Sequence, residues 1–153
     1  MSDHWPVRKL VVVESPYAGD VDLNVKYARS CLRDCLERGE APFASHLLYT
    51  QPGVLRDEDP EERAEGIQAG LSFLNGAAFH VVYVDRGVSP GMAEAISKNR
   101  KVGYPALRYR SLRLPGQDFE SLEAVAHLIG GWCVTGRTAP EYTQTAPPPG
   151  ATP

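Results

Sequence analysis

The chain has 153 residues, of which 42% are hydrophobic and 23% are charged, and its formal net charge is −3. Length and composition are those of one ordinary globular domain. The negative net charge argues against a nucleic acid polymer as the main partner, and no apolar run reaches the roughly 20 residues that span a bilayer. The N-terminus lacks the apolar segment of a signal peptide, so we expect a cytoplasmic protein without membrane contact.

The first predicted element is a strand over residues 10–13, because the run LVVV is continuous, apolar and β-branched. The strand ends before Pro16, which has no N–H group to donate to a neighbouring strand. The turn SPYAGD follows at residues 15–20, and Asp20 or Asp22 can cap the next helix. A buried strand that leads through a polar turn into a helix presents backbone N–H groups and a positive dipole to an anion. We therefore expect a ligand site at the end of this strand.

Further strands and helices alternate along the chain. In order we predict a helix at 22–38, a strand at 41–46, a loop at 50–60, a helix at 61–74, a strand at 79–84, a helix at 91–101, a strand at 104–109 and a helix at 119–129. Residues 47–49 either extend the second strand or begin the loop, which is of the length that often covers a site. Residues 1–135 form the predicted nucleotide-binding domain. Residues 136–153 are rich in Thr, Pro and Ala and are expected to be a disordered tail.

This alternation predicts an α/β fold: a single Rossmann-like or flavodoxin-like domain, with a parallel sheet of four to five strands and helices on both faces. If the first and third strands are neighbours, the helices at 22–38 and 91–101 lie on opposite faces. Ligands of such folds bind outside the carboxyl ends of the strands where the strand order reverses. The turns at that point are SPYAGD and DRGVSPGM (residues 85–92), so we predict the site between them.

The side chains of these turns suit a nucleotide. Gly91 allows a phosphate to approach the backbone and Ser89 offers a hydroxyl, although Ser89 is equally a simple helix cap. Tyr17 could stack on a base and Asp20 could bind sugar hydroxyls, although Asp20 is also explained as a cap. His46 ends the second predicted strand near the same point; a lone histidine is more often structural, but this position favours a functional role. The predicted ligand contacts are Ser15, Pro16, Tyr17, Gly19, Asp20, Asn24, His46, Tyr49, Asp85, Ser89, Pro90, Gly91 and Met92.

Carboxylates close two of the predicted strands. Glu14 and Asp85 would be catalytic, sugar-binding or paired with an arginine such as Arg86. No Ser–His–Asp or Cys–His arrangement and no Walker-type lysine is readable, and no cofactor is expected. No metal site is expected either: Cys31 and Cys35 have a spacing that permits a metal pair, but no further ligands lie nearby, so we interpret them as small core residues.

One stretch of the chain is basic. Six basic residues lie between Glu94 and Asp118 with no acidic residue among them. They could attract phosphates, or they could form a solvated helix end and strand edge. These residues are Lys98, Arg100, Lys101, Arg108, Arg110 and Arg113.

Several segments in this order resemble the small bacterial and bacteriophage proteins of the nucleoside 2-deoxyribosyltransferase-like group. They are SPYAGD, Asn24, APFASHLLY, DEDPEER, GIQAGLSFL and VSPGM, and they span residues 10–110. The resemblance implies a Rossmann-like nucleotide-binding domain that assembles as a homo-oligomer. In the enzymes of the group, a glutamate in the pattern S-x-G-M-x-x-E-I attacks the anomeric carbon of a nucleoside or nucleotide. Here the run is SPGMAEAI at residues 89–96, which places Ala95 in the nucleophile's position.

Alanine cannot supply the carboxylate that covalent glycosyl transfer needs. Glu94 comes one residue early, which turns its side chain by about 100° around the helix axis. Our leading interpretation is a protein that binds a nucleotide or a (cyclic) ADP-ribose-like molecule and sequesters or senses it without cleavage. One alternative is a nucleotide N-glycosidase or 2-deoxyribosyltransferase that uses Glu14, Asp85 or Glu94. Another is an interaction module with a vestigial pocket.

Overall fold

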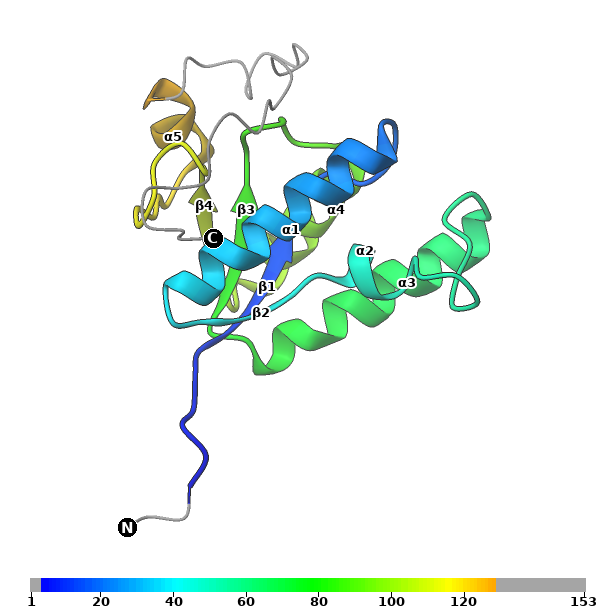
Figure 1. Ribbon diagram of the computed structural model, residues 1–153, viewed down its shortest axis with the longest axis horizontal. Helices are drawn as coiled ribbons and strands as arrows, with labels where there is room; N and C mark the ends of the chain where they lie inside the picture. The colour runs from blue at the N-terminus through cyan, green and yellow to red at the C-terminus, as the bar shows by residue number, and fades with distance from the viewer. Residues whose placement is uncertain (1–3, 129–153) are drawn as a thin grey trace, which may run out of the picture.

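A four-stranded parallel sheet lies at the centre of the computed structural model, which describes residues 4–128 (Figure 1). The strand order is β2-β1-β3-β4. The strands are β1 (Leu10–Glu14), β2 (Ala41–Phe43), β3 (Phe79–Tyr83) and β4 (Ala106–Arg110). Since β1 and β3 are neighbours and all pairings are parallel, the α/β fold predicted from the sequence is confirmed. The predicted tail at 136–153 lies outside the described residues.

The strands are connected through helices and polar turns. The helices are α1 (Val21–Glu37), α2 (Ser45–Leu48), α3 (Pro60–Ser72) with the 3-10 turn η1 (Phe73–Gly76), α4 (Pro90–Val102) and α5 (Leu122–Leu128). Two predicted caps are present: the Asp20 carboxylate accepts the backbone N–H of Leu23, and the Ser89 hydroxyl accepts that of Met92. Gly103 ends α4 in the left-handed conformation, with φ of 75°. No helix in the described ranges has both the length and the apolar character needed to cross a membrane.

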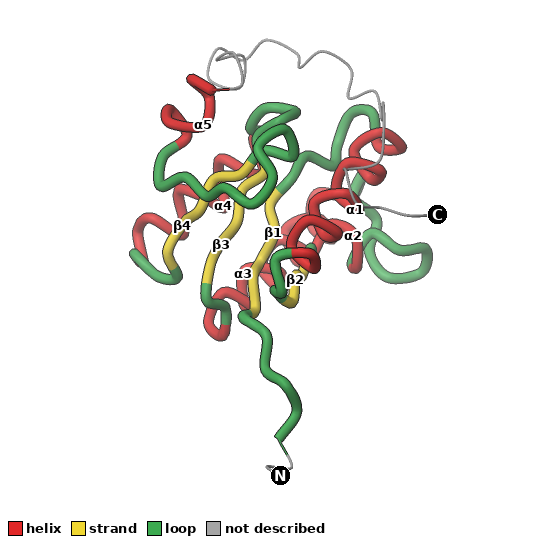
Figure 2. Tube along the Cα trace, turned by 60° about the vertical axis from the view of Figure 1, so that its left-hand side comes forward, coloured by secondary structure: helices red, strands yellow, loops and turns green. Residues whose placement is uncertain are grey.

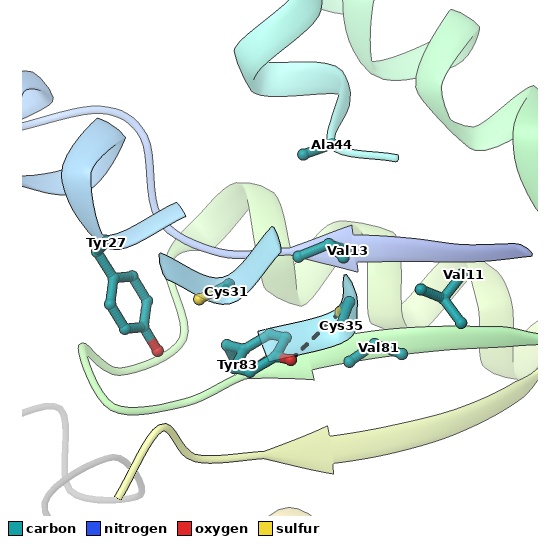
Figure 3. Close-up of a cluster of buried hydrophobic side chains, with 8 residues drawn as sticks. All are labelled: Val11, Val13, Tyr27, Cys31, Cys35, Ala44, Val81 and Tyr83. Carbon is teal, nitrogen blue, oxygen red and sulfur yellow. Dashed lines mark hydrogen bonds between the residues drawn. The ribbon is translucent and has the colours of Figure 1, made fainter. Parts of the chain in front are cut away.

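One face of the sheet packs against α1. Alternate residues of β1 and β3 point to this face, where Tyr83 and the valines beside it meet Tyr27, Cys31 and Cys35 (Figure 3). The Cys35 Sγ lies 3.3 Å from the Tyr83 hydroxyl, and burial raises the pKa of the Cys35 thiol to about 11. Both cysteines are free and buried, and no cluster of potential metal ligands occurs within residues 4–128. Their burial confirms the interpretation of Cys31 and Cys35 as core residues.

The opposite face is covered by α3, α4 and α5. Val12 of β1 packs with Leu74 and Ala77, whereas Val82 of β3 packs with residues of α4 and α5, including Met92. The helices α1 and α4 thus lie on opposite faces, as predicted. Figure 2 shows that the loops after the strands gather at one end of the sheet, while residues 4–9 leave from the other end. The carboxyl ends of the strands are therefore brought together.

The prediction of a strand over 41–46 is wrong in its second half. β2 ends at Phe43 because it is an edge strand that pairs with β1 over only three residues. The next residues form α2, whose carbonyls at His46 and Leu47 accept hydrogen bonds from the Thr50 and Gln51 side chains. His46 therefore stands in a short helix, not at a strand end. The last predicted strand also begins later, at Ala106.

The basic segment contains one residue that is neither solvated nor available to a phosphate. Arg110 is fully buried on the α1 face and donates two hydrogen bonds of 2.7 Å to the Glu40 carboxylate. Its Nε also donates to Asp118. Because both carboxylates come from other segments, this guanidinium joins β4 to the loops on either side. The interpretation of Arg110 as part of a solvated strand edge is therefore wrong.

Candidate functional site

A cavity of about 260 Å³ opens at the carboxyl ends of the central strands. Its wall is built from the end of β1 and the turn after it, from α2, from the loop at 50–59, from α3 and from the start of α4. Two of these segments are the turns that the sequence placed at the reversal of strand order. This volume lies just below the range of about 300 to 1,000 Å³ that is usual for small-molecule sites.

Eight of the thirteen predicted ligand contacts line this cavity, together with the candidate carboxylate Glu14. They are Ser15, Tyr17, His46, Tyr49, Ser89, Pro90, Gly91 and Met92. The other five, Pro16, Gly19, Asp20, Asn24 and Asp85, are not part of its wall. The structure therefore brings both turns to one cavity. It also separates the predicted residues that line the cavity from those that lie outside its wall.

Asp85 shapes the site from within the core. Its carboxylate is 2% exposed and accepts hydrogen bonds from the Tyr27 hydroxyl at 2.7 Å, the Ser111 hydroxyl at 2.5 Å and the Leu112 N–H at 3.0 Å. Burial, and then the nearby Cys31 and Asp85, raise the pKa of Tyr27 well above its ordinary value. The hydrogen bonds of the Asp85 carboxylate thus join β3 to α1 and to the segment after β4.

Asn24 holds the two turns against each other. Its Nδ2 donates to the carbonyls of Tyr17 and Ala18, at 3.0 and 3.1 Å. Its Oδ1 accepts from Nε of Arg86 at 2.8 Å, so the first turn is tied to the second through one buried amide. Arg86 consequently pairs with Asn24, whereas a pair with a strand-end carboxylate was one of three alternatives left open by the sequence.

The start of α4 presents Ala95 to the cavity and turns Glu94 away from it. Ala95 is 4% exposed and lines the cavity. Glu94 is exposed and forms a 2.8 Å ion pair with Lys98, and the hydrogen bond in this pair lowers the pKa of Glu94. Of the three candidate carboxylates, Glu14 is therefore the one that lines the cavity.

Each of the two consecutive residues Glu14 and Ser15 is bonded to a histidine. Glu14 Oε1 lies 3.0 Å from Nε2 of His80, a fully buried residue of β3. Ser15 Oγ lies 2.8 Å from Nε2 of His46, and the edge of the His46 ring meets the Tyr17 ring at 6.4 Å between centroids. Burial lowers the pKa of His46, so its imidazole is neutral at pH 7. A Ser–His pair was not readable from the sequence, because its members lie 31 residues apart on elements of different type.

The side of the cavity formed by the loop at 50–59 and by α3 carries charged residues that the sequence did not predict as part of the site. It contains Asp57, Glu62 and Arg63, and Arg63 Nη1 donates to Asp57 at 3.1 Å. A Cβ atom on Gly91 would lie 3.7 Å from Arg63 Nη2, so this guanidinium stands over the start of α4. The segment DEDPEER, at residues 57–63, was the available signal: it carries all three residues, but nothing in it alone indicates which side chains face inward.

The formal charges of the wall do not favour a polyanion. Glu14, Asp57 and Glu62 contribute three carboxylates, against the single guanidinium of Arg63. Glu62 is bound by Arg56, whose hydrogen bonds lower the pKa of that carboxyl. The positive groups of the wall are Arg63 and the N-terminal turn of α4.

The α/β fold, with a cavity at the point where its strand order reverses, is of the Rossmann-like type. The chain belongs to the family described as Domain of unknown function (DUF7768), whose model matches residues 9–109. A solved structure with a similar fold is that of a 2-deoxyribosyltransferase from the psychrotolerant bacterium Bacillus psychrosaccharolyticus, described as a biocatalyst for nucleoside synthesis. It is 16% identical, with a TM-score of 0.52 over 67% of this chain and 72% of that chain. Curated proteins gave no match.

Proposed function

We propose that the chain binds a nucleoside or nucleotide-type molecule in the cavity and holds it without cleaving it, in a sequestering or sensing role. The observation that carries this proposal is that both turns at the reversal of strand order line one cavity. Ligands of parallel α/β folds bind at this position. The fold shared with a nucleoside-processing enzyme makes a nucleoside the natural first choice of ligand.

The charge distribution limits the phosphates that such a ligand carries. The positive groups are Arg63 and the start of α4, where Gly91 leaves the backbone accessible. The three carboxylates of the wall would repel a longer phosphate chain. A nucleoside or a monophosphate therefore fits the cavity better than a triphosphate does, and the small volume points the same way.

Retention without cleavage is proposed from the position of Ala95. In the pattern of the nucleoside 2-deoxyribosyltransferase-like group, this position carries the attacking glutamate. The alanine side chain faces the cavity and has no nucleophilic atom. The neighbouring Glu94 is exposed and paired with Lys98, so it does not replace the missing carboxylate.

The test is to incubate the purified protein with adenosine, 2′-deoxyadenosine, AMP and cyclic ADP-ribose, and then to analyse the bound fraction by chromatography. The proposal predicts that at least one of them is recovered intact and raises the melting temperature. The matched variants are Glu14→Gln, inside the cavity, and Glu94→Gln, outside it. Only the first should weaken binding. Absence of binding by every compound would reject the proposal.

A second candidate is an N-glycosidase, and the observation in its favour is that Glu14 lines the cavity. In this reaction Glu14 Oε2 would form a bond to the anomeric carbon while the carbon–nitrogen bond breaks, and the leaving base would take a proton from solvent water. Water would then release the sugar and restore the carboxylate. Free base in the incubation, lost in Glu14→Gln but kept in Glu94→Gln, would establish this activity in place of simple binding.

A further inference from the structure

His80 is a fully buried histidine in the centre of a parallel sheet. Its cross-strand partners are Val12 on β1 and Leu107 on β4, and both are apolar. Strands buried on both faces are normally made of valine, isoleucine and leucine. A polar ring at this position costs free energy of folding unless it is hydrogen-bonded. The hydrogen bond that His80 makes should therefore indicate its role.

That partner is the carboxylate of Glu14. The His80 Nε2 lies 3.0 Å from Glu14 Oε1, whereas Nδ1 is buried and has no hydrogen-bond partner within the described residues. A carboxylate can only accept, so the proton of the pair lies on Nε2. A second proton on Nδ1 would be a buried donor without an acceptor, which is costly. The geometry thus assigns the neutral Nε2–H tautomer to His80.

The second oxygen of Glu14 is the free one. No hydrogen bond to Oε2 is present in the described part of the chain, and Glu14 lines the cavity with 16% of its side chain exposed. Since Oε1 is fixed from behind by a residue of the rigid central sheet, rotation of the carboxylate is restricted. Oε2 is then held as an acceptor for a group inside the cavity.

We infer that His80 is a positioning residue: it orients Glu14 so that Oε2 accepts a hydrogen bond from a hydroxyl or amino group of the bound molecule. This inference rests on the proposed function, because it assumes that the cavity is occupied. His80 itself makes no contact with the ligand. This positioning of Glu14 explains why a histidine stands in the sheet, although the unpaired Nδ1 lowers the free energy of unfolding.

Two substitutions separate positioning from a structural role. His80→Gln keeps an N–H group that can reach Glu14, whereas His80→Leu keeps the volume but has no donor. Leucine suits the apolar neighbours Val12 and Leu107 and removes the unpaired Nδ1, which offsets the loss of the hydrogen bond to Glu14 Oε1, so the melting temperature of His80→Leu should stay close to that of wild type. Its affinity for AMP or adenosine should nevertheless fall about tenfold, while His80→Gln stays within about threefold of wild type.

The measurements are calorimetric titration with AMP and adenosine, thermal unfolding, and the ¹⁵N chemical shifts of the His80 ring. The inference predicts the neutral Nε2–H tautomer, which His80→Gln identifies by loss of its signals. Equal affinity of wild type and His80→Leu, or equal weakening by Gln and Leu, would overturn it. If neither probe binds wild type, the proposed function fails, and the ring shifts still decide whether His80 donates to Glu14: an Nδ1–H or doubly protonated ring would refute the assignment.

Discussion

Ser15 Oγ and His46 Nε2 lie 2.8 Å apart, and this bond joins the end of β1 to the short helix after β2. It places a neutral imidazole at the wall of the cavity, beside Tyr17. The secondary structure around His46 was predicted wrongly, since a strand was expected where α2 forms. The bond has consequences for stability that can be measured.

The first prediction concerns pH. Burial lowers the pKa of His46 below its ordinary value of 6.5, while nearby Glu14 and Asp57 partly oppose this effect. Well above pH 6.5 the ring is neutral in both folded and unfolded chains. As pH falls below 6.5, the unfolded chain binds the proton first, so the free energy of unfolding decreases until the pH passes the lower pKa of the folded state. Urea denaturation at pH 7.5 and 5.5 should show a smaller loss for His46→Gln than for wild type. Equal losses would mean that His46 does not resist protonation.

The second prediction separates Asp85 from the cavity. Asp85→Asn keeps one acceptor oxygen and replaces the other by an NH2 group, which donates and cannot accept, so it disrupts part of the set of hydrogen bonds to the buried Asp85 side chain. We expect it to lower the free energy of unfolding by about 2 to 3 kcal/mol. Asp22→Asn, on an exposed carboxylate at the start of α1, is the control and should change it by less than about 0.5 kcal/mol. Denaturant titration measures both. A stable Asp85→Asn protein that has lost only its ligand would instead place Asp85 in the binding site.

The third prediction concerns the packing of α2 on α3. A Cβ atom on Gly70 would lie 2.6 Å from Cβ and Oγ of Ser45, so Gly70→Ala must displace α2 or α3. We expect a loss of about 1 to 3 kcal/mol. Gly76→Ala is the matched control, because its Cβ meets no atom within 4 Å. Because His46 follows Ser45 on α2, Gly70→Ala should also weaken ligand binding. Comparable stability of the two variants would show that α2 is not packed as described.

The fourth prediction locates the phosphate. Arg63 stands over Gly91 at the start of α4, so Arg63→Gln should weaken the binding of AMP about tenfold while the affinity for adenosine changes little. Arg33→Gln is the control, since Arg33 lies exposed on α1 and pairs with Glu37. Calorimetric titration with both compounds gives the comparison. An equal effect of Arg63→Gln on AMP and adenosine would place the phosphate elsewhere.

Much of the architecture could be predicted because local signals agreed with tertiary ones. The valines of β1, the cap at Asp20 and the Ser89-Pro90 helix start each mark an element from a few neighbouring residues. The failure at α2 has the opposite cause. That helix has only four residues, so it is too short to show a helical periodicity in the sequence. Its surroundings are tertiary: the Thr50 side chain of the following loop bonds to it, and Gly70 packs closely on Ser45.

The residues of the candidate site that follow β1 were predicted, whereas Arg63, which lies on a helix face, was missed. Glu14 and Ser15 end a strand, so topology alone brings them to the cavity. Arg63 faces inward because of how α3 lies against the sheet, and the sequence does not show that orientation. Asp85 also ends a strand but is buried, because Tyr27 of α1 reaches it from 58 residues away.

The most direct test of the central claim is a titration of ¹⁵N-labelled protein with AMP, followed by amide chemical shifts. The account predicts saturating shifts at both turns of the cavity, around Ser15 and Gly91, with one molecule bound per chain. The Glu14→Gln variant should need a higher AMP concentration to reach the same shifts. Shifts that are absent, or that cluster away from these two turns, would contradict the assignment of this cavity as a nucleoside or nucleotide site.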